Sequence, residues 1–278
     1  MRKHLSTILL VVILITGLSL LLYPTVSDAW NASLQTGKID AYTQNVADLP
    51  NEAYQDMLQK ARAYNARLYE EKHILALSDS ERPEYESLLA VGADGAMGYI
   101  EIPKIRCTLP IYHGTNEAVL QSAIGHIEGS SLPVGGENTH CVLSGHRGLP
   151  SAKLFSNLDQ MEVGDTFQLH ILDETLTYEV DQIRIVLPEE VDELKPQEGM
   201  DLCTLVTCTP YGVNTHRLLV RGHRVANAAG GENIRVPMDA VQLDPLMVAP
   251  VVAVPILLLL LVLLFRGGRH TKKKEKRS

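Results

Sequence analysis

The sequence predicts an all-β fold for the central part of the chain, from Gly98 to Val225. Short apolar runs rich in Val, Ile, Leu and Thr are broken about every ten residues by Gly, Pro, Asn or Asp, a pattern typical of strands and turns. The clearest runs are Gly98–Ile105, Thr139–Ser144, Thr166–Leu172, Thr175–Val186, Leu202–Cys208 and His216–Val225. Their spacing alone does not distinguish a barrel from a sandwich.

A helical segment is predicted before this region. The stretch opened by Leu49-Pro50-Asn51 runs to about Leu77 and is rich in Glu, Gln, Ala, Arg and Lys. Its apolar residues recur at spacings of three and four, which gives one face that can pack on the β domain. These residues are Tyr54, Leu58, Ala61, Tyr64 or Asn65, and Leu68. The following Ala76–Glu86 lacks periodicity and is predicted to be a loop.

Two uncharged apolar runs, Leu5–Tyr23 and Leu246–Phe265, flank everything else. Each is long enough to cross a bilayer as a helix, which needs about 20 residues. Lys and Arg precede the first run and follow the second, so both termini are expected in the cytoplasm and the middle of the chain outside. The first run could instead be a cleaved signal peptide ending near Ser27-Asp28-Ala29, although it is longer than the usual apolar core of such peptides.

The charge distribution agrees with this division. The segment between the two runs holds 16 Lys and Arg against 32 Asp and Glu, a net charge of −16. Such an acidic domain is not expected to bind nucleic acid or anionic lipid headgroups, which need a basic face. It favours substrates that carry amines, unless the acidic surface serves only solubility.

The four cysteines are not expected to form disulfides, even in an exported domain. Cys203 and Cys208 are five residues apart on one predicted strand and so face opposite sides of the sheet. Cys107 and Cys141 lie in apolar strand-like segments, where a free Cys is usually a small buried hydrophobic residue. No His/Cys pairing at zinc-ligand spacing occurs, so no metal or other cofactor is predicted.

Three side chains are candidates for catalysis. The turn-rich loop Thr209–His216 joins Leu202–Cys208 to a strand that begins at Arg217, and antiparallel pairing would bring Cys208 and Arg217 to one rim. His146 follows another predicted strand, Thr139–Ser144. Together they supply a thiol nucleophile, a fixed cation for an oxyanion and a group that can donate and accept a proton, which is what splitting an amide requires.

The motif Thr204-Leu205-Val206-Thr207-Cys208, followed by Arg217 and preceded by His146, resembles the signature of sortases, the transpeptidases of Gram-positive cell surfaces. The similarity extends over about Gly98 to Arg224 and points to the pilin-polymerising, or class C, branch. The stretches that carry it are Gly98–Ile105, Leu109–Thr115 and Gly129–Gly136.

The resemblance implies a closed eight-stranded β-barrel with short helices. It also implies that Cys208 is the nucleophile, His146 the acid/base and Arg217 the stabiliser of substrate and oxyanion. The expected reaction cleaves an LPxTG-type sorting signal between Thr and Gly, leaves a thioester on Cys208 and transfers the acyl group to a lysine amine of another pilin subunit. The partners are therefore LPxTG-bearing pilins and the lipid bilayer, at the cell membrane.

The chain is accordingly expected to divide into six segments. They are a cytoplasmic start and transmembrane helix at 1–23, an extracellular helical segment with a lid-like loop at 24–90, the catalytic barrel at 91–226, a linker at 227–245, a second transmembrane helix at 246–265 and a basic cytoplasmic tail at 266–278.

The sequence departs from the resembled family in its lid-like loop. In that family an Asp-Pro-aromatic triplet often covers the cysteine. Here Asp79 is followed by Ser80 and Glu81, so no aromatic ring is placed to rest on the thiol. Asp79 remains a candidate for a single lid contact with Arg217.

Other functional classes stay open. A housekeeping wall-anchoring sortase would usually have only an N-terminal span, so the run Leu246–Phe265 favours the pilus branch. An extracellular thiol peptidase would release a free carboxylate in water without needing an amine. An inactive membrane-bound scaffold would have no use for Cys208, His146 and Arg217 together. A papain-like enzyme is disfavoured because the chain order here is His, Cys, Arg and no Asp or Asn is marked as an orienter of the histidine.

Overall fold

The computed structural model describes residues 2–71, 75 and 77–227, with side chains from residue 11 onward. Its first element is the helix α1, Arg2–Ala47. The part Val11–Ala47 is long and apolar enough to cross a membrane, by length and composition. The predicted apolar helix is therefore confirmed, but it continues well past Tyr23 because Pro24 does not end it. The second predicted span, Leu246–Phe265, lies outside the described residues.

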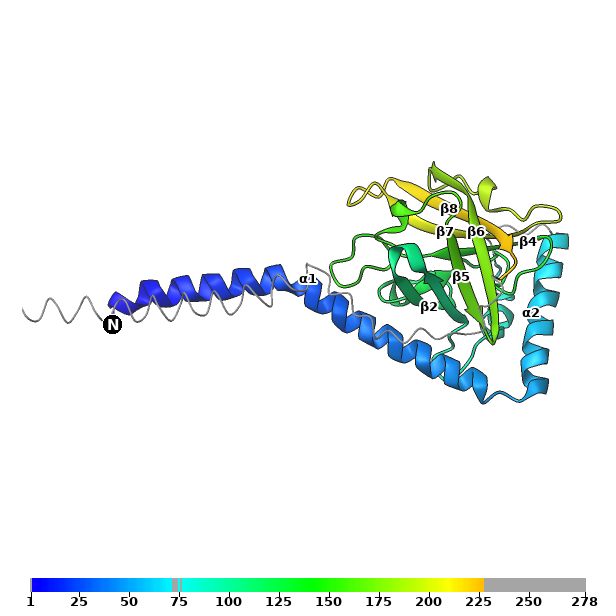
Figure 1. Cartoon of the computed structure of the whole chain (residues 1–278), viewed down its shortest axis with the longest axis horizontal. Helices are drawn as coiled ribbons and strands as arrows, with labels where there is room; N and C mark the ends of the chain where they lie inside the picture. The colour runs from blue at the N-terminus through cyan, green and yellow to red at the C-terminus, as the bar shows by residue number, and fades with distance from the viewer. Residues whose placement is uncertain (1, 72–74, 76, 228–278) are drawn as a thin grey trace, which may run out of the picture. The chain divides into compact units, whose positions relative to one another are not determined.

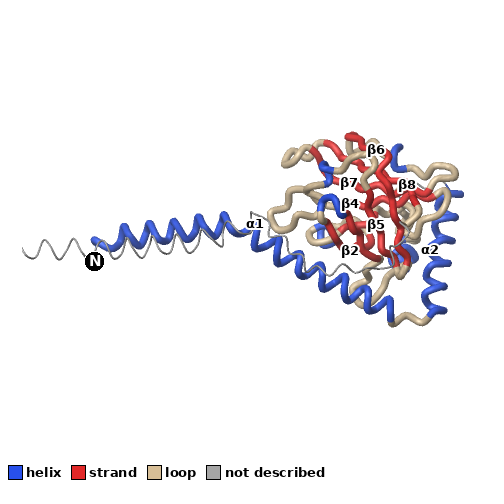
Figure 2. Tube along the Cα trace, in the orientation of Figure 1, coloured by secondary structure: helices blue, strands red, loops and turns tan. Residues whose placement is uncertain are grey.

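Eight strands form a closed barrel in the order β1-β2-β3-β4-β7-β8-β6-β5, with β5 pairing back to β1. Figures 1 and 2 show the strands curling around one another. The β2–β3 and β4–β7 pairs are parallel and the others antiparallel. The strands are β1 Gly98–Ile102, β2 Cys107–His113, β3 Ile124–His126, β4 Thr139–Ser144, β5 Thr166–Ile171, β6 Glu174–Val186, β7 Asp201–Thr209 and β8 His216–Val225. The closed barrel implied by the family resemblance is confirmed.

Short helical turns lie between these strands, and one precedes them. The connecting turns are α4 Glu117–Leu120, η1 Pro103–Ile105, η2 Leu158–Gln160 and η3 Asp192–Leu194, and α3 Arg82–Ser87 comes before β1. The predicted strand Gly98–Ile105 ends early because Pro103 begins η1, where its fixed φ suits a helical turn. β3 was not predicted, since it has only three residues. β2 was predicted only as the strand-like segment around Cys107, without bounds, and it contains Pro110. A proline and a very short run both weaken the strand signal in a sequence.

The helix α2, Asn51–Glu71, confirms the predicted apolar stripe, because its buried residues are Leu58, Ala61, Tyr64, Asn65 and Leu68. They join the same core as the barrel interior. Asn65 also bonds the backbone of Leu132 in both directions, donating to its carbonyl at 3.0 Å and accepting from its amide at 2.7 Å. Figure 1 shows α2 beside the barrel.

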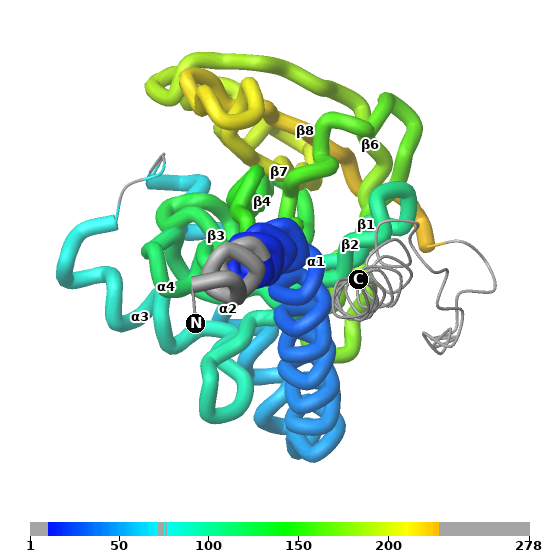
Figure 3. The backbone as a smooth tube through the Cα atoms, turned by 90° about the vertical axis from the view of Figure 1, so that its left-hand side faces the viewer, coloured from blue at the N-terminus to red at the C-terminus, as the bar shows by residue number. Residues whose placement is uncertain are grey.

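The segment Ala76–Glu86 is not the simple loop that its sequence indicates. It contains most of α3, which places Tyr85 in the core with no exposed surface. The Tyr85 hydroxyl lies 2.8 Å from Nδ1 of His126 and accepts a hydrogen bond from the amide of Gly114 at 3.1 Å. Arg82 forms an ion pair with Glu128 beside β3. Figure 3 shows α3 on the same side of the barrel as β3. This segment is therefore packed on the barrel through a core side chain.

Tyr85→Phe is expected to lower the free energy of unfolding by about 1–3 kcal/mol, because it leaves the buried Gly114 amide and the His126 ring without their partner. The measurement is chemical denaturation of the full chain in detergent. Tyr211→Phe is the matched control, since Tyr211 is 63% exposed. Equal stabilities of the Tyr85→Phe variant and the wild type would show that this hydroxyl contributes nothing to holding α3.

Candidate active site

The β7–β8 hairpin places Cys208 opposite Arg217. The two residues are direct partners in the antiparallel register, followed by the last pair Thr209 and His216. Directly opposed residues on neighbouring strands have Cβ atoms roughly 4.5–5.5 Å apart and project to the same face. The predicted pairing of Cys208 with Arg217 on one rim is thus present in the structure.

Parallel pairing of β4 with β7 brings His146 to the same end of the barrel. The register runs to Ser144 opposite Val206. It is continued by the Gly145 amide, which donates to the Val206 carbonyl at 3.1 Å, and by the Thr207 hydroxyl, which donates to the Gly145 carbonyl at 2.7 Å. The residue before Cys208 is therefore bonded to the residue before His146, and the order His146, Cys208, Arg217 follows the strand order β4, β7, β8.

Cys208 and Arg217 lie on the outer face of the barrel. Along β7, Cys203 and Leu205 face the main core, whereas Val206 belongs to a separate apolar cluster. The buried members of this outer cluster are Val142, Leu194, Val206 and Leu219, and Leu75, Ile127 and Val186 pack against them. Because alternate residues share a face, Cys208 stands on the same side of β7 as Val206. The catalytic candidates therefore border an apolar cluster on the outside of the barrel.

Arg217 is the cation on β8 that lies at this rim. Its guanidinium donates to the carbonyls of Asn214 at 3.3 Å and His216 at 3.1 Å, and within residues 77–227 it forms no ion pair with a carboxylate. Arg221, further along β8, is held instead by both oxygens of Asp181, at 2.9 and 3.0 Å. The positive charge of Arg217 is thus available to a bound anion or carbonyl.

His146 is partly exposed, with 30% of its side chain accessible. Its Nε2 lies 3.9 Å from a carboxylate oxygen of Glu117, the first residue of α4. This acidic neighbour was not predicted, since Glu117 is 29 positions earlier in the chain and belongs to no motif. At 73% exposure Glu117 is screened by solvent, so its influence on His146 is weak.

The other three cysteines are enclosed, as predicted. Cys107, Cys141 and Cys203 are free and buried, whereas Cys208 is partly exposed. Burial raises the pKa of Cys107 to about 12 and also raises the pKa of Cys203. Burial raises the pKa of Cys141 too, but hydrogen bonds with Cys203 and His126 outweigh it and lower the pKa overall. Cys141 is nevertheless only 3% exposed inside the barrel, where no peptide reaches it. Cys208 alone of the four is partly accessible.

Asp79 lies in an exposed turn just before α3. No hydrogen bond or ion pair joins it to Arg217 in the part of the chain that the structure describes. Its role as a lid contact therefore stays a prediction.

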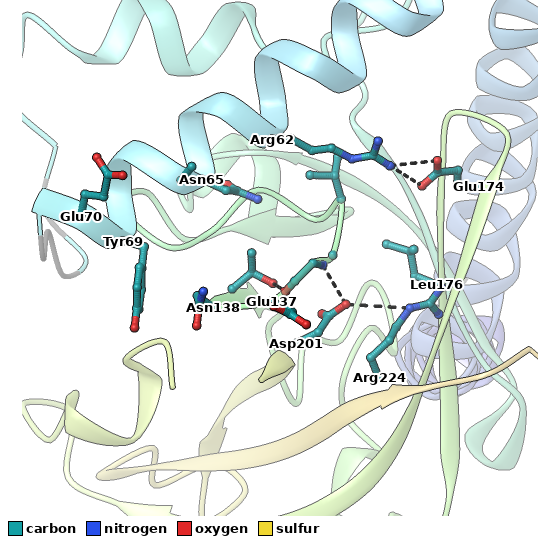
Figure 4. Close-up of a pocket in the computed structure, with 15 residues that line it drawn as sticks. Arg62, Asn65, Tyr69, Glu70, Glu137, Asn138, Glu174, Leu176, Asp201 and Arg224 are labelled. Atoms are coloured by element: carbon teal, nitrogen blue, oxygen red, sulfur yellow. Dashed lines mark hydrogen bonds and ion pairs between the residues drawn. The ribbon is translucent and has the colours of Figure 1, made fainter. Parts of the chain in front are cut away.

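A cavity of about 710 Å³ lies between α2 and the start of β7, not at the rim that holds Cys208 (Figure 4). Its lining includes Arg62 and Glu174, paired at 3.1 Å, and Asp201, which accepts from the Gly136 amide at 2.8 Å. Asp201 and Cys208 are seven residues apart on one strand, or roughly 23 Å at 3.3 Å per residue. Arg62 pairs with Glu174, and Asp201 with Arg224, so these four charged groups of the cavity are satisfied by one another. Among the described residues, no group of three His, Cys, Asp or Glu side chains is arranged to hold a metal ion.

Comparison with known proteins decides the family. The Sortase domain family matches residues 100–225. The crystal structure of sortase C1 from Streptococcus agalactiae is 53% identical, with a TM-score of 0.66, and the match covers 68% of this chain and 98% of that one. The chain belongs to the sortase family. Members of this family are cysteine transpeptidases.

Further solved sortases agree. Sortase C from Streptococcus pneumoniae is 44% identical, with 69% of this chain and 98% of that one covered and a TM-score of 0.63. Clostridium perfringens sortase C, solved with the C-terminal cell wall sorting motif, is also 44% identical, with 69% and 100% covered and a TM-score of 0.61. The structural neighbours are thus class C sortases, as the sequence predicted.

Curated sortases match over a smaller share of their length. Sortase D of Bacillus subtilis is 34% identical over 133 residues, which is 47% of this chain and 64% of that protein. Sortase A of Streptococcus agalactiae is 32% identical over 127 residues, 45% of this chain and 51% of that protein. This sortase therefore spans less than two thirds of either curated relative.

Proposed function

We propose that this sortase is a membrane-anchored cysteine transpeptidase that polymerises pilus subunits. It cleaves an LPxTG-type sorting signal between Thr and Gly and transfers the new acyl group to a lysine amine of a pilin. The observation that carries the proposal is the pairing of Cys208 with Arg217 on one rim of the barrel. The register of β4 with β7 brings His146 to the same rim.

The proposed chemistry has two halves. The Cys208 thiolate attacks the Thr carbonyl carbon, the oxyanion is stabilised by Arg217, and the bond to the Gly nitrogen breaks as His146 donates a proton to it. The thioester is then attacked by the lysine amine, His146 takes a proton from that amine, and the Cys208 thiolate leaves as the isopeptide bond forms. Arg217 cannot lose its proton at working pH, so it stays a fixed cation throughout.

The apolar outer cluster beside Cys208 supports a sorting signal as the substrate. Val186, the strand partner of Arg217, is only partly buried at the edge of this cluster and offers an apolar contact for the Leu and Pro side chains of the signal, upstream of the scissile bond. The Clostridium perfringens relative was solved with a C-terminal cell wall sorting motif. The accepting amine is inferred from the acidic character of the segment between the two apolar runs, which attracts cations.

We further infer that two helices anchor the sortase, with both termini in the cytoplasm and the barrel outside. The apolar part of α1 supports the first anchor. The second rests on the uncharged run Leu246–Phe265 and the Lys and Arg residues after it. In this scheme the barrel spans 91–226, 24–90 forms the helical segment with its lid-like loop, and 227–245 is the linker.

The test uses the full chain in detergent micelles, incubated with a Leu-Pro-x-Thr-Gly peptide with and without an amine such as a lysine peptide. The expected products, identified by mass spectrometry, are the released Gly fragment and an amide of the amine. A free carboxylate formed at the same rate with or without amine would favour a thiol peptidase instead. Equal transfer to an oligoglycine acceptor and to lysine would favour the wall-anchoring branch.

Arg217→Lys is expected to lower kcat/KM for transfer by at least about tenfold, because lysine keeps the charge but loses the planar fork that holds two oxygens. Steady-state kinetics of the amine-dependent reaction measure it. Arg224→Lys is the control: Arg224 lies further along β8 with its Nε 3.9 Å from Asp201, so a smaller effect is expected. Wild-type turnover in Arg217→Lys would show that the fork geometry plays no catalytic part.

A further inference from the structure

One turn of α1 is bonded to the loop that carries His146. This loop, residues 145–157, follows β4. The Asn31 amide donates to the Ser151 carbonyl at 2.7 Å, and the Ser27 hydroxyl donates to the same carbonyl at 3.2 Å. The Asp28 carboxylate accepts from the Lys153 amide at 2.8 Å. Residues 27, 28 and 31 lie one turn apart on a helix and so present their side chains to one neighbour.

The α1 side chains form hydrogen bonds with backbone groups of this loop, and these bonds fix the path of the loop backbone. The Asp28 carboxylate also lies 3.5 Å from the Lys153 ammonium, and the Asp28 side chain is 21% exposed. These are charge-assisted or well-formed bonds to residues 151–153, which belong to no strand or helix themselves. A loop whose carbonyl and amide are both engaged by a helix loses much of its freedom.

The same loop folds back onto His146. The Phe155 amide, two residues after Lys153, donates to the His146 carbonyl at 3.1 Å. Phe155 is fully buried, and its ring lies against Gly145, where an added Cβ would stand 2.7 Å from it. The Gly148 amide donates to the Ser156 hydroxyl oxygen at 3.0 Å. The anchored part, 151–153, is thus connected to the backbone of His146 through one buried side chain and one hydrogen bond.

We propose that Ser27, Asp28 and Asn31 are positioning residues, which hold the His146 loop in the geometry that proton transfer at Cys208 requires. The inference rests on the proposed role of His146. These residues follow the apolar run Leu5–Tyr23 directly, so the segment that anchors the chain also orders the catalytic loop. Loop placement matters because an error of about 1 Å in a catalytic group can cost about a hundredfold in rate.

The test compares variants of the full chain in detergent micelles. Asp28→Ala combined with Asn31→Ala is expected to lower kcat for transfer by about tenfold while KM for the sorting-signal peptide changes less than about twofold, because the β7–β8 rim and the apolar outer cluster are untouched. In the same samples, without substrate, hydrogen exchange of the amides at 147–155 is expected to accelerate. Asp40→Ala, on an exposed position of the same helix, should match the wild type in both measurements.

Two near-isosteric changes separate positioning from general loss of structure. Asn31→Asp removes the donor to the Ser151 carbonyl and should lower kcat as Asn31→Ala does. Asp28→Asn keeps an oxygen that can accept from the Lys153 amide and should recover a large part of the activity that Asp28→Ala loses. The inference would be overturned if kcat did not depend on whether a variant keeps or removes this donor and this acceptor.

The inference would also be overturned if the amides at 147–155 of the double variant exchanged hydrogen at the wild-type rate, whatever the kinetics show. That measurement does not depend on activity. Absence of amine-dependent transfer in the wild type would instead overturn the proposed function, so the two failures are distinguishable.

Discussion

Cys208→Ala is expected to abolish both peptide cleavage and amine ligation, because no other group of the rim can form the thioester. Cys208 is the partly exposed cysteine and the direct strand partner of Arg217. The loss should reach the detection limit, a fall of more than about a thousandfold, as for other enzymes that lose their nucleophile. Product analysis by mass spectrometry, with and without amine, measures both half-reactions.

The matched control for this prediction is Cys203→Ala, on the same strand. Cys203 faces the barrel interior with no exposed surface, so its removal should leave transfer largely intact. Cys107→Ala and Cys141→Ala should do the same. Trapping the acyl-enzyme with substrate and mapping the added mass gives an independent readout. An acyl group on any cysteine other than Cys208 would refute the assignment.

The hairpin that carries the candidate site could be predicted because its signals are local. The β-rich run Leu202–Cys208 and a Pro-, Gly- and Asn-containing loop define the turn, and the turn then sets the register that opposes Cys208 and Arg217. β4 was predicted with its observed bounds for the same reason. Its parallel pairing with β7 was not predictable from spacing, because many other strands could have been neighbours.

Elements stabilised by distant contacts could not be predicted. The segment Ala76–Glu86 has no periodic apolar pattern, yet α3 forms there because one tyrosine finds partners in His126 and Gly114. A single buried side chain leaves no period in the sequence. α1 likewise continues beyond Tyr23 through Pro24, and its polar residues bind the backbone of the Ser151–Lys153 segment more than a hundred positions later.

The candidate site shows the same limit. The nucleophile and the cation were marked by a motif, whereas Glu117 near His146 and the α1 residues that bind the loop after it carry no motif. Such residues act by positioning other groups, and backbone carbonyls and amides can form hydrogen bonds with many types of side chain. Only the folded chain brings them to His146.

His146→Ala is expected to lower kcat/KM for transfer by about a hundredfold to ten-thousandfold, the usual contribution of a positioned acid–base group. The leaving amine would depart without a proton, and the incoming lysine would attack without a base. Because the β7–β8 rim and the apolar outer cluster stay intact, KM for the sorting-signal peptide should change little. Steady-state kinetics of the amine-dependent reaction measure this.

His216→Ala is the decisive control for that prediction, because His216 is the neighbouring histidine on the same rim. It pairs with Thr209, one position beyond the Cys208–Arg217 pair, so the alternation of a strand turns its side chain to the opposite face from Cys208. Its removal should leave kcat/KM for transfer close to that of the wild type. If His216→Ala instead lowered kcat/KM while His146→Ala did not, the acid–base role would belong to the hairpin, and the parallel register of β4 and β7 would have no catalytic meaning.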